Sequence, residues 1–377
     1  MKKRVSGYPR WRWRAGAVLC VGISLVILFL LKLQSLVLDN SLDDVLLTSR
    51  RDTSSTEYRN STKPKLAFMF LARESMPLDI LWQHFFEGSH EHEYSVYIHA
   101  RPGYVYTKTA TKCHAFINRQ IKKPIQVWWG EATMIEAERL LLLAALQDPL
   151  NLRFLLLSDS CIPLYNFGYV YNYVMSSHKS FVDSFVDYND TQYNSKMSSV
   201  IPKGAWRKGS QWFVLIRKHA EKIVTDSLVF PVFQNHCKVY LFLDLALLVF
   251  GQLLVNKTQE NCIPDEHYIQ TLLSMQEMET EIERRTLTYT WWENSKSGKG
   301  REGWHPVTFN TADATLKTIT NIQNINNVRY DTESRIEWCS SEGQPRPCYL
   351  FARKFTRGAA FQLLDLVPSY EKAEYTH

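Results

Sequence analysis

The sequence predicts an α/β protein in which a mainly parallel sheet carries helices on both faces, behind an N-terminal transmembrane helix. Two observations predict this fold. Apolar strand-like runs alternate with amphipathic stretches along the chain, which is typical of parallel sheets joined by crossover helices. A separate apolar run at residues 15–31 is long enough to cross a bilayer.

The alternation of strands and helices starts at residue 65. Four apolar runs predict buried strands: 65–71, 94–99, a run that ends at 127–130, and 154–157. Two amphipathic stretches predict helices at 78–88 and 132–146. A helix between two strands returns the chain to the same end of the sheet, so these strands are expected to run parallel.

The strand at 154–157 runs into a polar turn, Ser158-Asp159-Ser160. Ligands bind at the carboxyl ends of strands in sheets of this kind, so the turn is a candidate site. A further strand is predicted at Phe181-Val182-Asp183-Ser184-Phe185, with Asp183 as an inward acid. No G-x-G-x-x-G or P-loop sequence accompanies these elements, which argues against a dinucleotide dehydrogenase or a nucleotide triphosphatase.

The N-terminal apolar run is flanked by unequal charge. Six basic residues precede it: Lys2, Lys3, Arg4, Arg10, Arg12 and Arg14. The positive-inside rule then places residues 1–14 in the cytosol and the body of the chain in the lumen, with a signal-anchor helix at 15–33. The lumenal part is expected to comprise a stem at 34–64 and one large domain at 65–377. A cleaved signal peptide is the alternative.

The formal net charge of the chain is +6. The six basic residues before the apolar run account for that charge, so the rest of the chain is close to neutral. A neutral body lacks the positive surface that nucleic acid requires, which argues against a nucleic-acid-binding protein.

Six cysteines follow the apolar run: Cys113, Cys161, Cys237, Cys262, Cys339 and Cys348. No C-x-x-C or Cys/His cluster predicts a zinc site, so disulfides in an oxidising lumen are expected. Cys339 and Cys348 bracket a Gly/Pro-rich loop and are the favoured pair. Asn-x-Ser/Thr triplets predict glycosylation at Asn60 and Asn189.

A general base is predicted in Pro264-Asp265-Glu266-His267-Tyr268, where carboxylates follow a proline at the start of an amphipathic stretch, 268–275. Such a helix start holds a side chain in a rigid position, with aromatic groups nearby to bind a flat or sugar-like molecule. The alternative is a helix cap, in which the acids only interact with the positive end of the helix dipole.

Two tryptophans flank a basic turn in Trp206-Arg207-Lys208-Gly209-Ser210-Gln211-Trp212-Phe213. Aromatic faces stack on sugar rings while polar groups donate hydrogen bonds to the sugar hydroxyls. The alternative is that both tryptophans belong to the core. Later motifs add chemistry suited to sugars and phosphates: Tyr289-Thr290-Trp291-Trp292, Gly303-Trp304-His305-Pro306 and Phe351-Ala352-Arg353-Lys354-Phe355.

Five segments in this order resemble the Core-2/I-branching β-1,6-N-acetylglucosaminyltransferase family, glycosyltransferase family 14, and its plant brittle-culm-type branch. They are Leu157-Ser158-Asp159-Ser160-Cys161-Ile162-Pro163-Leu164, 206–213, 264–268, 303–309 and 351–355. The resemblance runs from residue 65 to about residue 366. It implies a GT-A-like glycosyltransferase fold in a type II Golgi membrane protein that uses a UDP-sugar, inverts the anomeric centre and needs no metal.

The resemblance also implies roles for individual residues. Glu266 matches the family's catalytic base, which deprotonates the acceptor hydroxyl. Arg346 and Lys354 match two cations that neutralise the donor diphosphate in place of a divalent ion. Three residues are expected on the acceptor side: Asp183, Trp206 and Trp292, with Trp291 as the alternative to Trp292.

The sequence departs from the family pattern at three places, although the spacing of Cys339 and Cys348 fits a family disulfide. Val214 stands where plant relatives usually carry an acid, and Asp159 stands where Glu is commoner. The apolar insert 239–259 has no family counterpart. It is interpreted as a second membrane span, as a buried helix or hairpin, or as a translated retained intron, and transcript sequencing across the insert tests the last.

The predicted function is transfer of a sugar, N-acetylglucosamine or a related one, from a UDP-sugar to a glycan, glycoprotein or cell-wall polysaccharide. No cofactor or metal is expected, and a homodimer is considered. The alternative is a non-catalytic lumenal carbohydrate-binding or scaffold protein with a degenerate transferase fold. A glycoside hydrolase ranks last because it needs two facing carboxylates, and only Glu266 is well placed.

Overall fold

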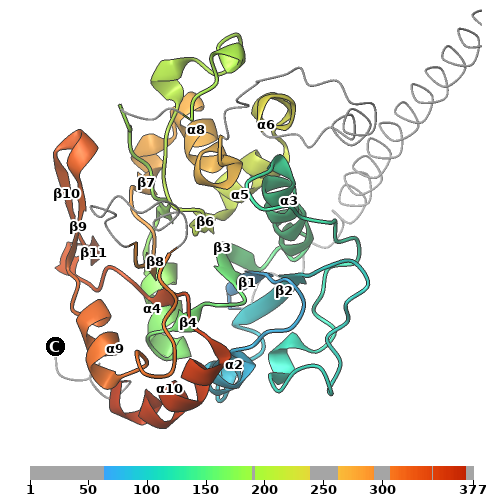
Figure 1. The fold of residues 1–377 in the computed structure, drawn as a ribbon, viewed down its shortest axis with the longest axis vertical. Helices are drawn as coiled ribbons and strands as arrows, with labels where there is room; N and C mark the ends of the chain where they lie inside the picture. Colours follow the sequence, from blue (N-terminus) through green and yellow to red (C-terminus); the bar gives the residue numbers. More distant parts are fainter. Residues whose placement is uncertain (1–62, 189–191, 238–261, 293–305, 342, 371–377) are drawn as a thin grey trace, which may run out of the picture. The chain divides into compact units, whose positions relative to one another are not determined.

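The computed structural model describes residues 63–188, 192–237, 262–292, 306–341 and 343–370. In this part of the chain a central sheet has the strand order β2-β1-β3-β6-β5-β7 (Figure 1). Its strands are β1 (Lys65–Leu71), β2 (Tyr94–His99), β3 (Asn151–Ser158), β5 (Ser180–Phe181), β6 (Val214–Ile216) and β7 (Ile282–Glu283).

Most of the pairs in the central sheet are parallel. β1 pairs in parallel with β2 and β3, and β5 pairs in parallel with β7. β6 is the exception, because it runs antiparallel to both β3 and β5. The predicted α/β class with a mainly parallel sheet is therefore confirmed, with β6 reversed.

Both faces of this sheet are buried, which is why its central strands are almost wholly apolar. Alternate residues of β1 enter two separate cores: Leu66, Phe68 and Phe70 enter one, and Ala67 and Met69 enter the other. This division follows from the two-residue period of a strand.

Helices supply the opposite walls of the two cores. The first core is covered by α2 (Asp79–Phe86), α4 (Phe167–Ser176) and α10 (Arg357–Tyr370). The second is covered by α3 (Ala132–Leu146), α5 (Arg217–Val224), α6 (Val229–His236) and α8 (Tyr268–Met275). Figure 1 shows the two groups on opposite sides of β1–β3. The predicted helices at 78–88 and 132–146 correspond to α2 and α3.

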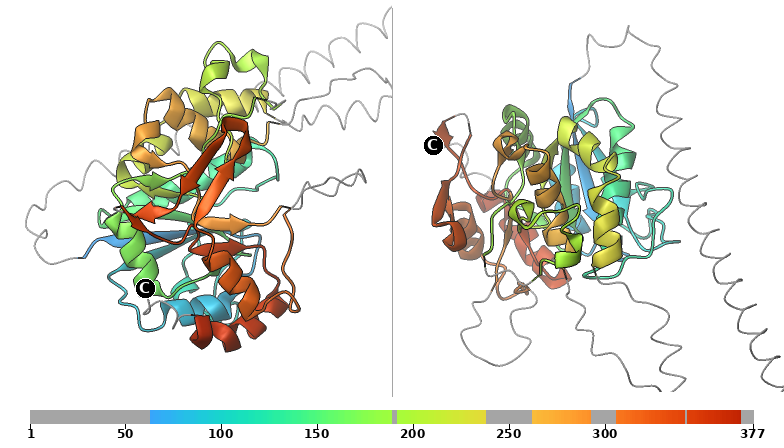
Figure 2. Two further views of the ribbon diagram at one scale, coloured as in Figure 1. Left: turned by 90° about the vertical axis from the view of Figure 1, so that its left-hand side faces the viewer. Right: turned by 90° about the horizontal axis from the view of Figure 1, so that it is seen from above.

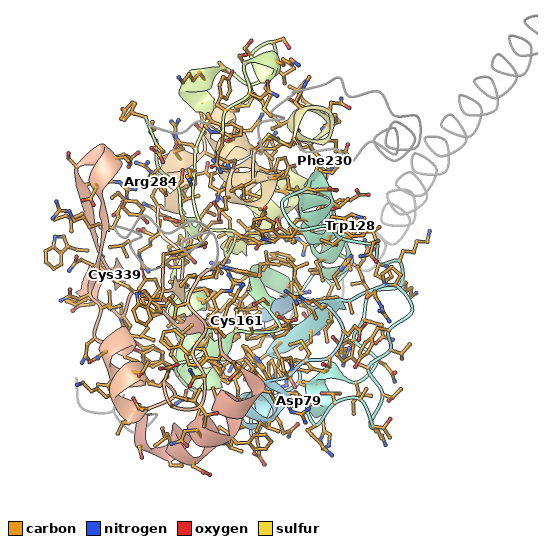
Figure 3. The ribbon with its side chains drawn as sticks, in the orientation of Figure 1. Asp79, Trp128, Cys161, Phe230, Arg284 and Cys339 are labelled. Atoms are coloured by element: carbon orange, nitrogen blue, oxygen red, sulfur yellow. A yellow bond between two sulfur atoms is a disulfide. The ribbon has the colours of Figure 1, made fainter. Side chains whose placement is uncertain are left out.

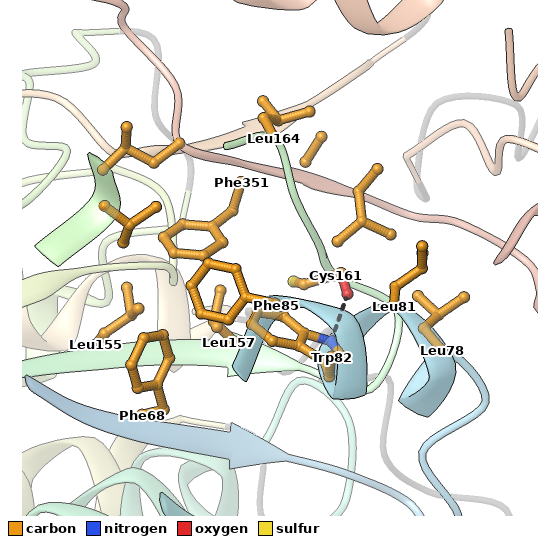
Figure 4. Packing of buried hydrophobic residues seen from close by; sticks show 14 of the residues in the cluster. Phe68, Leu78, Leu81, Trp82, Phe85, Leu155, Leu157, Cys161, Leu164 and Phe351 are labelled. Carbon is orange, nitrogen blue, oxygen red and sulfur yellow. Dashed lines mark hydrogen bonds between the residues drawn. The ribbon is translucent and has the colours of Figure 1, made fainter. Parts of the chain in front are cut away.

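Aromatic packing fastens α2 to the first core (Figure 4). The rings of Phe68 and Phe85 meet edge to face with centroids 5.7 Å apart, and such aromatic pairs add stability beyond the area that they bury. The buried Trp82 Nε1 donates a hydrogen bond of 3.1 Å to the carbonyl of Cys161. This bond ties α2 to the turn that follows β3.

A second sheet, with order β4-β13-β8, lies beside the first core. It consists of β4 (Ile162–Pro163), β13 (Phe351–Arg353) and β8 (Thr288–Thr290). β13 pairs in parallel with β8 and antiparallel to β4. Because β4 follows directly after the Ser158–Ser160 turn, this small sheet carries the C-terminal basic motif to the end of β3.

The C-terminal part of the described chain adds α9 (Leu316–Gln323) and two hairpins. One hairpin is β9 (Asn327–Tyr330) with β10 (Arg335–Trp338), and the other is β11 (Ser340–Ser341) with β12 (Gln344–Pro345). Figure 2 shows the orange-red hairpin of β9 and β10 from two further directions.

Two sequence predictions of strands need correction. Residues 127–130 form no strand; Gly130 has a φ of 73°. A single β-bridge joins Ile98 of β2 to Gln120 instead. The chain therefore pairs with this edge of the sheet before it reaches residue 127. The strand expected around Asp183 shortens to Ser180–Phe181.

Several predictions concern residues outside those that the structure describes: the signal-anchor helix at 15–33, the glycosylation sites Asn60 and Asn189, and the insert 239–259. Within residues 63–370 as far as they are described, no helix has the length and apolar character needed to cross a membrane.

Two disulfides connect described residues. Cys339 and Cys348 have Cα atoms 5.1 Å apart and close the β11–β12 hairpin. Cys237, at the end of α6, and Cys262 have Cα atoms 5.3 Å apart across a sequence separation of 25. The second disulfide therefore fixes both ends of the segment that contains the insert.

Loss of the Cys237–Cys262 disulfide is expected to lower the free energy of unfolding by roughly 3 kcal/mol, since the bond closes a loop of that length in the unfolded chain. The double variant Cys237→Ala/Cys262→Ala, followed by thermal unfolding, measures this loss. The Cys339–Cys348 disulfide closes a shorter loop. The matched variant Cys339→Ala/Cys348→Ala should therefore lose about 1 kcal/mol less of the free energy of unfolding. Equal losses, or a larger loss for the shorter loop, would contradict the argument.

Candidate active site

The predicted base lies in a strained turn. The 3-10 helix η4 (Pro264–Glu266) is preceded by Ile263, whose φ of 41° and ψ of 71° are in the left-handed region. A β-branched residue rarely adopts this conformation, and strained residues of this kind cluster at functional sites. The Ile263 carbonyl accepts a hydrogen bond of 3.0 Å from the Glu266 N–H. The disulfide at Cys262 and the ring of Pro264 flank the strained residue.

Residues 206–213, here called the tryptophan segment, pack directly against this turn. The N–H of Gly209 donates a hydrogen bond of 2.9 Å to the Glu266 carbonyl. A Cβ atom on Gly209 would lie 1.9 Å from the carbonyl oxygen of Asp183. Glycine is therefore required here by close approach of three backbone segments.

Asp183 lies on the other side of Gly209 and is partly buried. Its Oδ2 accepts a hydrogen bond of 2.9 Å from the Ser210 N–H, and its Oδ1 accepts one from the Tyr330 hydroxyl of β9. Burial raises the pKa of Asp183. The two hydrogen bonds oppose this rise, whereas the charge of Glu266 adds to it. Asp183 and Glu266 are thus neighbouring acids held by the same segment.

Two further acids lie behind the base. Burial, reinforced by the charge of Glu266, raises the pKa of Asp265 from 3.8 to about 7. Glu138 of α3 is only 2% exposed and accepts a hydrogen bond of 2.7 Å from the Gln211 side chain. Burial also raises the pKa of Glu138, and the charge of Asp265 adds to this effect. The buried surroundings therefore disfavour the charged forms of both acids, which lessens the negative charge behind Glu266.

The cations gather at the carboxyl ends of β1, β3 and β13. The Asp159 carboxylate follows β3 and accepts a hydrogen bond of 3.3 Å from the N–H of Arg73, which follows β1. The N–H of Phe355 donates a bond of 3.0 Å to the Ser160 carbonyl, so Arg353 and Lys354 lie against the same turn. Burial first, and then the like charges of Arg353 and Arg73, lower the pKa of Lys354. Such an excess of positive charge favours an anionic ligand.

The structure assigns Trp206 to the core, which corrects the prediction of an acceptor-binding role. Trp206 is 5% exposed. Its ring stacks on His267 with centroids 4.5 Å apart and on Phe233 at 5.6 Å, so its surface is not open to a sugar. Trp212 is also buried, and the guanidinium of Arg353 lies over its ring at 4.3 Å.

Trp292 and Arg346 are both on the surface. Trp291 and Trp292 follow β8 and are 43% and 46% exposed. The parallel register pairs Thr290 with Arg353, so both tryptophans continue from the strand next to Lys354. Arg346 is exposed in the chain after β12, and its N–H donates a bond of 3.0 Å to the Cys339 carbonyl. Figure 3 shows Cys161, which follows the Asp159 turn, well inside the fold and Cys339 toward its edge.

Comparison with known proteins identifies the family. The sequence model of the Core-2/I-branching enzyme family matches residues 66–323. The chain belongs to this family. It is 51% identical to the rice (Oryza sativa subsp. japonica) protein "Glycosyltransferase BC10" over 307 residues, which cover 80% of this chain and 76% of the rice protein. This similarity places the chain in the plant brittle-culm-type branch of the family, and the chain is a glycosyltransferase.

Sequence reasoning did not propose Arg73 or Glu138 for the site, and it included Asp265 and Arg353 in functional motifs without giving either a role of its own. Arg73 stands two residues after a predicted strand, so the rule that ligands bind at strand ends was sufficient to propose it. Arg353 directly precedes Lys354. Glu138 had no recognisable pattern, because only the packing of α3 against η4 brings it behind the base.

Gly209→Ala is expected to destabilise this glycosyltransferase by about 2–3 kcal/mol, since the added methyl group overlaps the Asp183 carbonyl and neither backbone segment can give way without strain. Thermal or denaturant unfolding measures the effect. Gly204→Ala is the matched control, because no atom lies within 4 Å of a Cβ built there, and it should change stability by less than about 0.5 kcal/mol. Similar losses in both variants would show that close approach at Gly209 is unimportant.

Asp265→Asn is expected to flatten the pH dependence of stability. The folded protein holds the Asp265 proton up to about pH 7, whereas the unfolded chain releases it near 3.8. The unfolded state therefore binds fewer protons in this window, and the raised pKa makes the free energy of unfolding fall as the pH rises from about 4 to about 7. Asparagine cannot ionise, so this fall should shrink in the variant.

Unfolding by denaturant at a series of pH values tests the Asp265 prediction. Asp331→Asn serves as a control, because the Asp331 side chain is 80% exposed and should give the wild-type profile. If the free energy of unfolding of Asp265→Asn depended on pH as in the wild type, Asp265 would have the same pKa in the folded and unfolded states, and the prediction would be wrong.

Proposed function

We propose that this glycosyltransferase transfers a sugar from a UDP-sugar to a hydroxyl of a glycan, glycoprotein or cell-wall polysaccharide, with inversion and without a metal ion. The proposal depends mainly on one observation. The turn that carries Glu266 packs on the tryptophan segment, whose Trp212 lies under Arg353, and the N–H of Phe355 bonds to the Ser160 carbonyl, so the motif that carries Lys354 lies at the carboxyl end of β3. N-acetylglucosamine is the proposed sugar, from the family resemblance.

In the proposed reaction Glu266 accepts the proton of the acceptor hydroxyl. The hydroxyl oxygen forms a bond to the anomeric carbon from the face opposite the diphosphate, and the bond between that carbon and the diphosphate oxygen breaks. UDP leaves with the electron pair. Lys354, with its neighbouring cations, stabilises the negative charge that develops on the diphosphate, a role that fixed cations can perform in place of a divalent ion.

The position of the exposed tryptophans supports a carbohydrate acceptor. Trp291 and Trp292 lie at the end of the strand beside Lys354, and large exposed aromatic side chains suit the apolar faces of sugar rings. Asp183 lies on the side of Glu266 formed by the tryptophan segment. We therefore assign Trp292 and Asp183 to the acceptor side of the proposed site.

A lumenal location in the Golgi, as a single-pass type II membrane protein, is part of the proposal. Its supports are the basic residues before the apolar run at 15–31 and the two disulfides, which persist in oxidising compartments.

Glu266→Gln is expected to lower kcat by about 10²–10⁴-fold, because the variant lacks a general base. The affinity for UDP should change less than about twofold, since the amide keeps the shape of the turn. The full chain in microsomal membranes is assayed for UDP release and product formation with UDP-N-acetylglucosamine and other UDP-sugars.

Glu221→Gln is the matched control for the base. Glu221 is an exposed residue of α5 whose ion pair with Arg217 contributes little. Unchanged turnover in Glu266→Gln would refute the role of Glu266. A wild-type protein that binds UDP or glycans but transfers no sugar would favour the carbohydrate-binding alternative.

A further inference from the structure

The β9–β10 hairpin contacts residues 183–186, here called the Asp183 segment, through side chains on one of its faces. The Tyr330 hydroxyl of β9 donates a hydrogen bond to Asp183 Oδ1, and Arg335 Nη2 of β10 donates one of 3.2 Å to the Ser184 carbonyl. Tyr330 and Arg335 are direct partners in the antiparallel register, so their side chains lie on the same face. The guanidinium of Arg335 lies over the Tyr330 ring at 3.9 Å, which restricts the orientation of the tyrosine.

A network of ion pairs anchors the turn of this hairpin. Glu333 lies between β9 and β10, with its Oε2 at 2.8 Å from Arg335 Nε and its Oε1 at 2.6 Å from Arg284 Nη2. The same Oε1 accepts a hydrogen bond of 2.9 Å from the Val186 N–H. Arg284 also donates a bond of 3.0 Å to the Ser184 carbonyl. Because these partly buried charges share several hydrogen bonds, they hold the hairpin on the Asp183 segment more firmly than an isolated surface ion pair would.

The tryptophan segment holds the Asp183 segment as well. Phe185 and Lys208 exchange two backbone hydrogen bonds of 2.8 and 2.9 Å, and the Ser210 N–H donates its bond to Asp183 Oδ2. Through Gly209 the same segment also binds the turn of the proposed base. The two carboxylate oxygens of Asp183 are therefore fixed by two different elements, the hairpin and the tryptophan segment.

Asp183 keeps the capacity to bind a further group. An ionised carboxylate can accept about four hydrogen bonds, and the bonds from Tyr330 and Ser210 occupy one position on each oxygen. The residue is partly exposed, so a hydroxyl of a sugar can donate to a position that is still open. Since both oxygens are already fixed, the carboxylate does not have to be ordered when a ligand binds, which lowers the cost of binding.

We propose that Tyr330 is a positioning residue for the acceptor: from the β9–β10 hairpin it orients the Asp183 carboxylate, which binds a hydroxyl of the acceptor sugar next to the Glu266 turn. This inference rests on the proposed function. Tyr330 acts through Asp183 and not on the reacting atoms. Under this assignment the hairpin governs binding of the acceptor, whereas the cations around Lys354 govern binding of the donor.

Tyr330→Phe tests this assignment, because it removes only the hydroxyl and keeps the ring beneath Arg335. The variant should raise the KM for the acceptor by about tenfold, which is the effect of one hydrogen bond to a charged group. The KM for the donor, the affinity for UDP and kcat at saturating acceptor should change less than about twofold. The full chain in microsomal membranes is assayed with UDP-N-acetylglucosamine and two acceptor probes, asialofetuin as a glycoprotein and xyloglucan as a cell-wall polysaccharide.

Two variants serve as controls. Tyr171→Phe is the matched one: the Tyr171 hydroxyl of α4 donates a hydrogen bond of 2.7 Å to the Pro64 carbonyl, so the variant loses the same group from the first core. Arg329→Gln changes the residue next to Tyr330 in β9, whose side chain is 74% exposed and points to the other face of the hairpin. Both controls should keep the wild-type KM for the acceptor.

A double-mutant cycle with Asp183→Ala shows whether Tyr330 acts through Asp183. Adding Tyr330→Phe to Asp183→Ala should raise the KM for the acceptor no further, because the hydroxyl then has no carboxylate to orient. Multiplicative increases would overturn the inference. So would a wild-type acceptor KM in Tyr330→Phe, an equal increase in Tyr171→Phe, or a Tyr330→Phe chain that does not fold, since the hydroxyl would then serve the fold.

Failure of the proposed function gives a different result. In that case the wild-type chain transfers no sugar to either probe, and the dissociation constants of the two probes replace KM in the same comparison. A wild-type chain that binds neither probe would overturn the proposed function and this inference together. Normal transfer with an unaltered acceptor KM in Tyr330→Phe would overturn only the inference.

Discussion

The close approach at Gly209 is the constraint on which the arrangement of the site depends. At this residue the tryptophan segment passes between Asp183 and the Glu266 turn without room for a Cβ atom. The contact lets the flanking residues reach their partners: Ser210 binds Asp183, Gln211 binds Glu138, and Trp212 supports Arg353. Four parts of the chain that are distant in sequence are therefore aligned by one backbone contact.

The elements that sequence reasoning predicted well are those whose burial is periodic. β1 and β3 are apolar on both faces because each contributes to two cores, and such runs are recognisable without tertiary information. The run ending at 127–130 has strand-forming residues, yet Trp128 and Trp129 are 56% and 48% exposed. A short aromatic run joins a sheet only where a strand edge is free to pair with it. Residues far away in the sequence decide whether such an edge is free.

The site was predictable only where a residue lies in a motif or at a strand end. Glu266 and Lys354 belong to family motifs, and the structure adds their surroundings. Trp206 and Trp212 share one basic aromatic pattern and are both buried, because α6, His267 and Arg353 cover them. The pattern of a segment does not reveal what packs on it, which is also why Glu138 of α3 was not predicted as a neighbour of the base.

The Cys237–Cys262 disulfide affects how much chain can be accommodated between α6 and η4. Its two Cα atoms lie 5.3 Å apart, so the residue after α6 is joined covalently to the residue before Ile263. The entropy of closing a loop grows only logarithmically, by about 0.6 kcal/mol for each doubling. Chain added between these cysteines therefore raises the entropic cost of closing the loop only slightly, while its two anchor points stay joined.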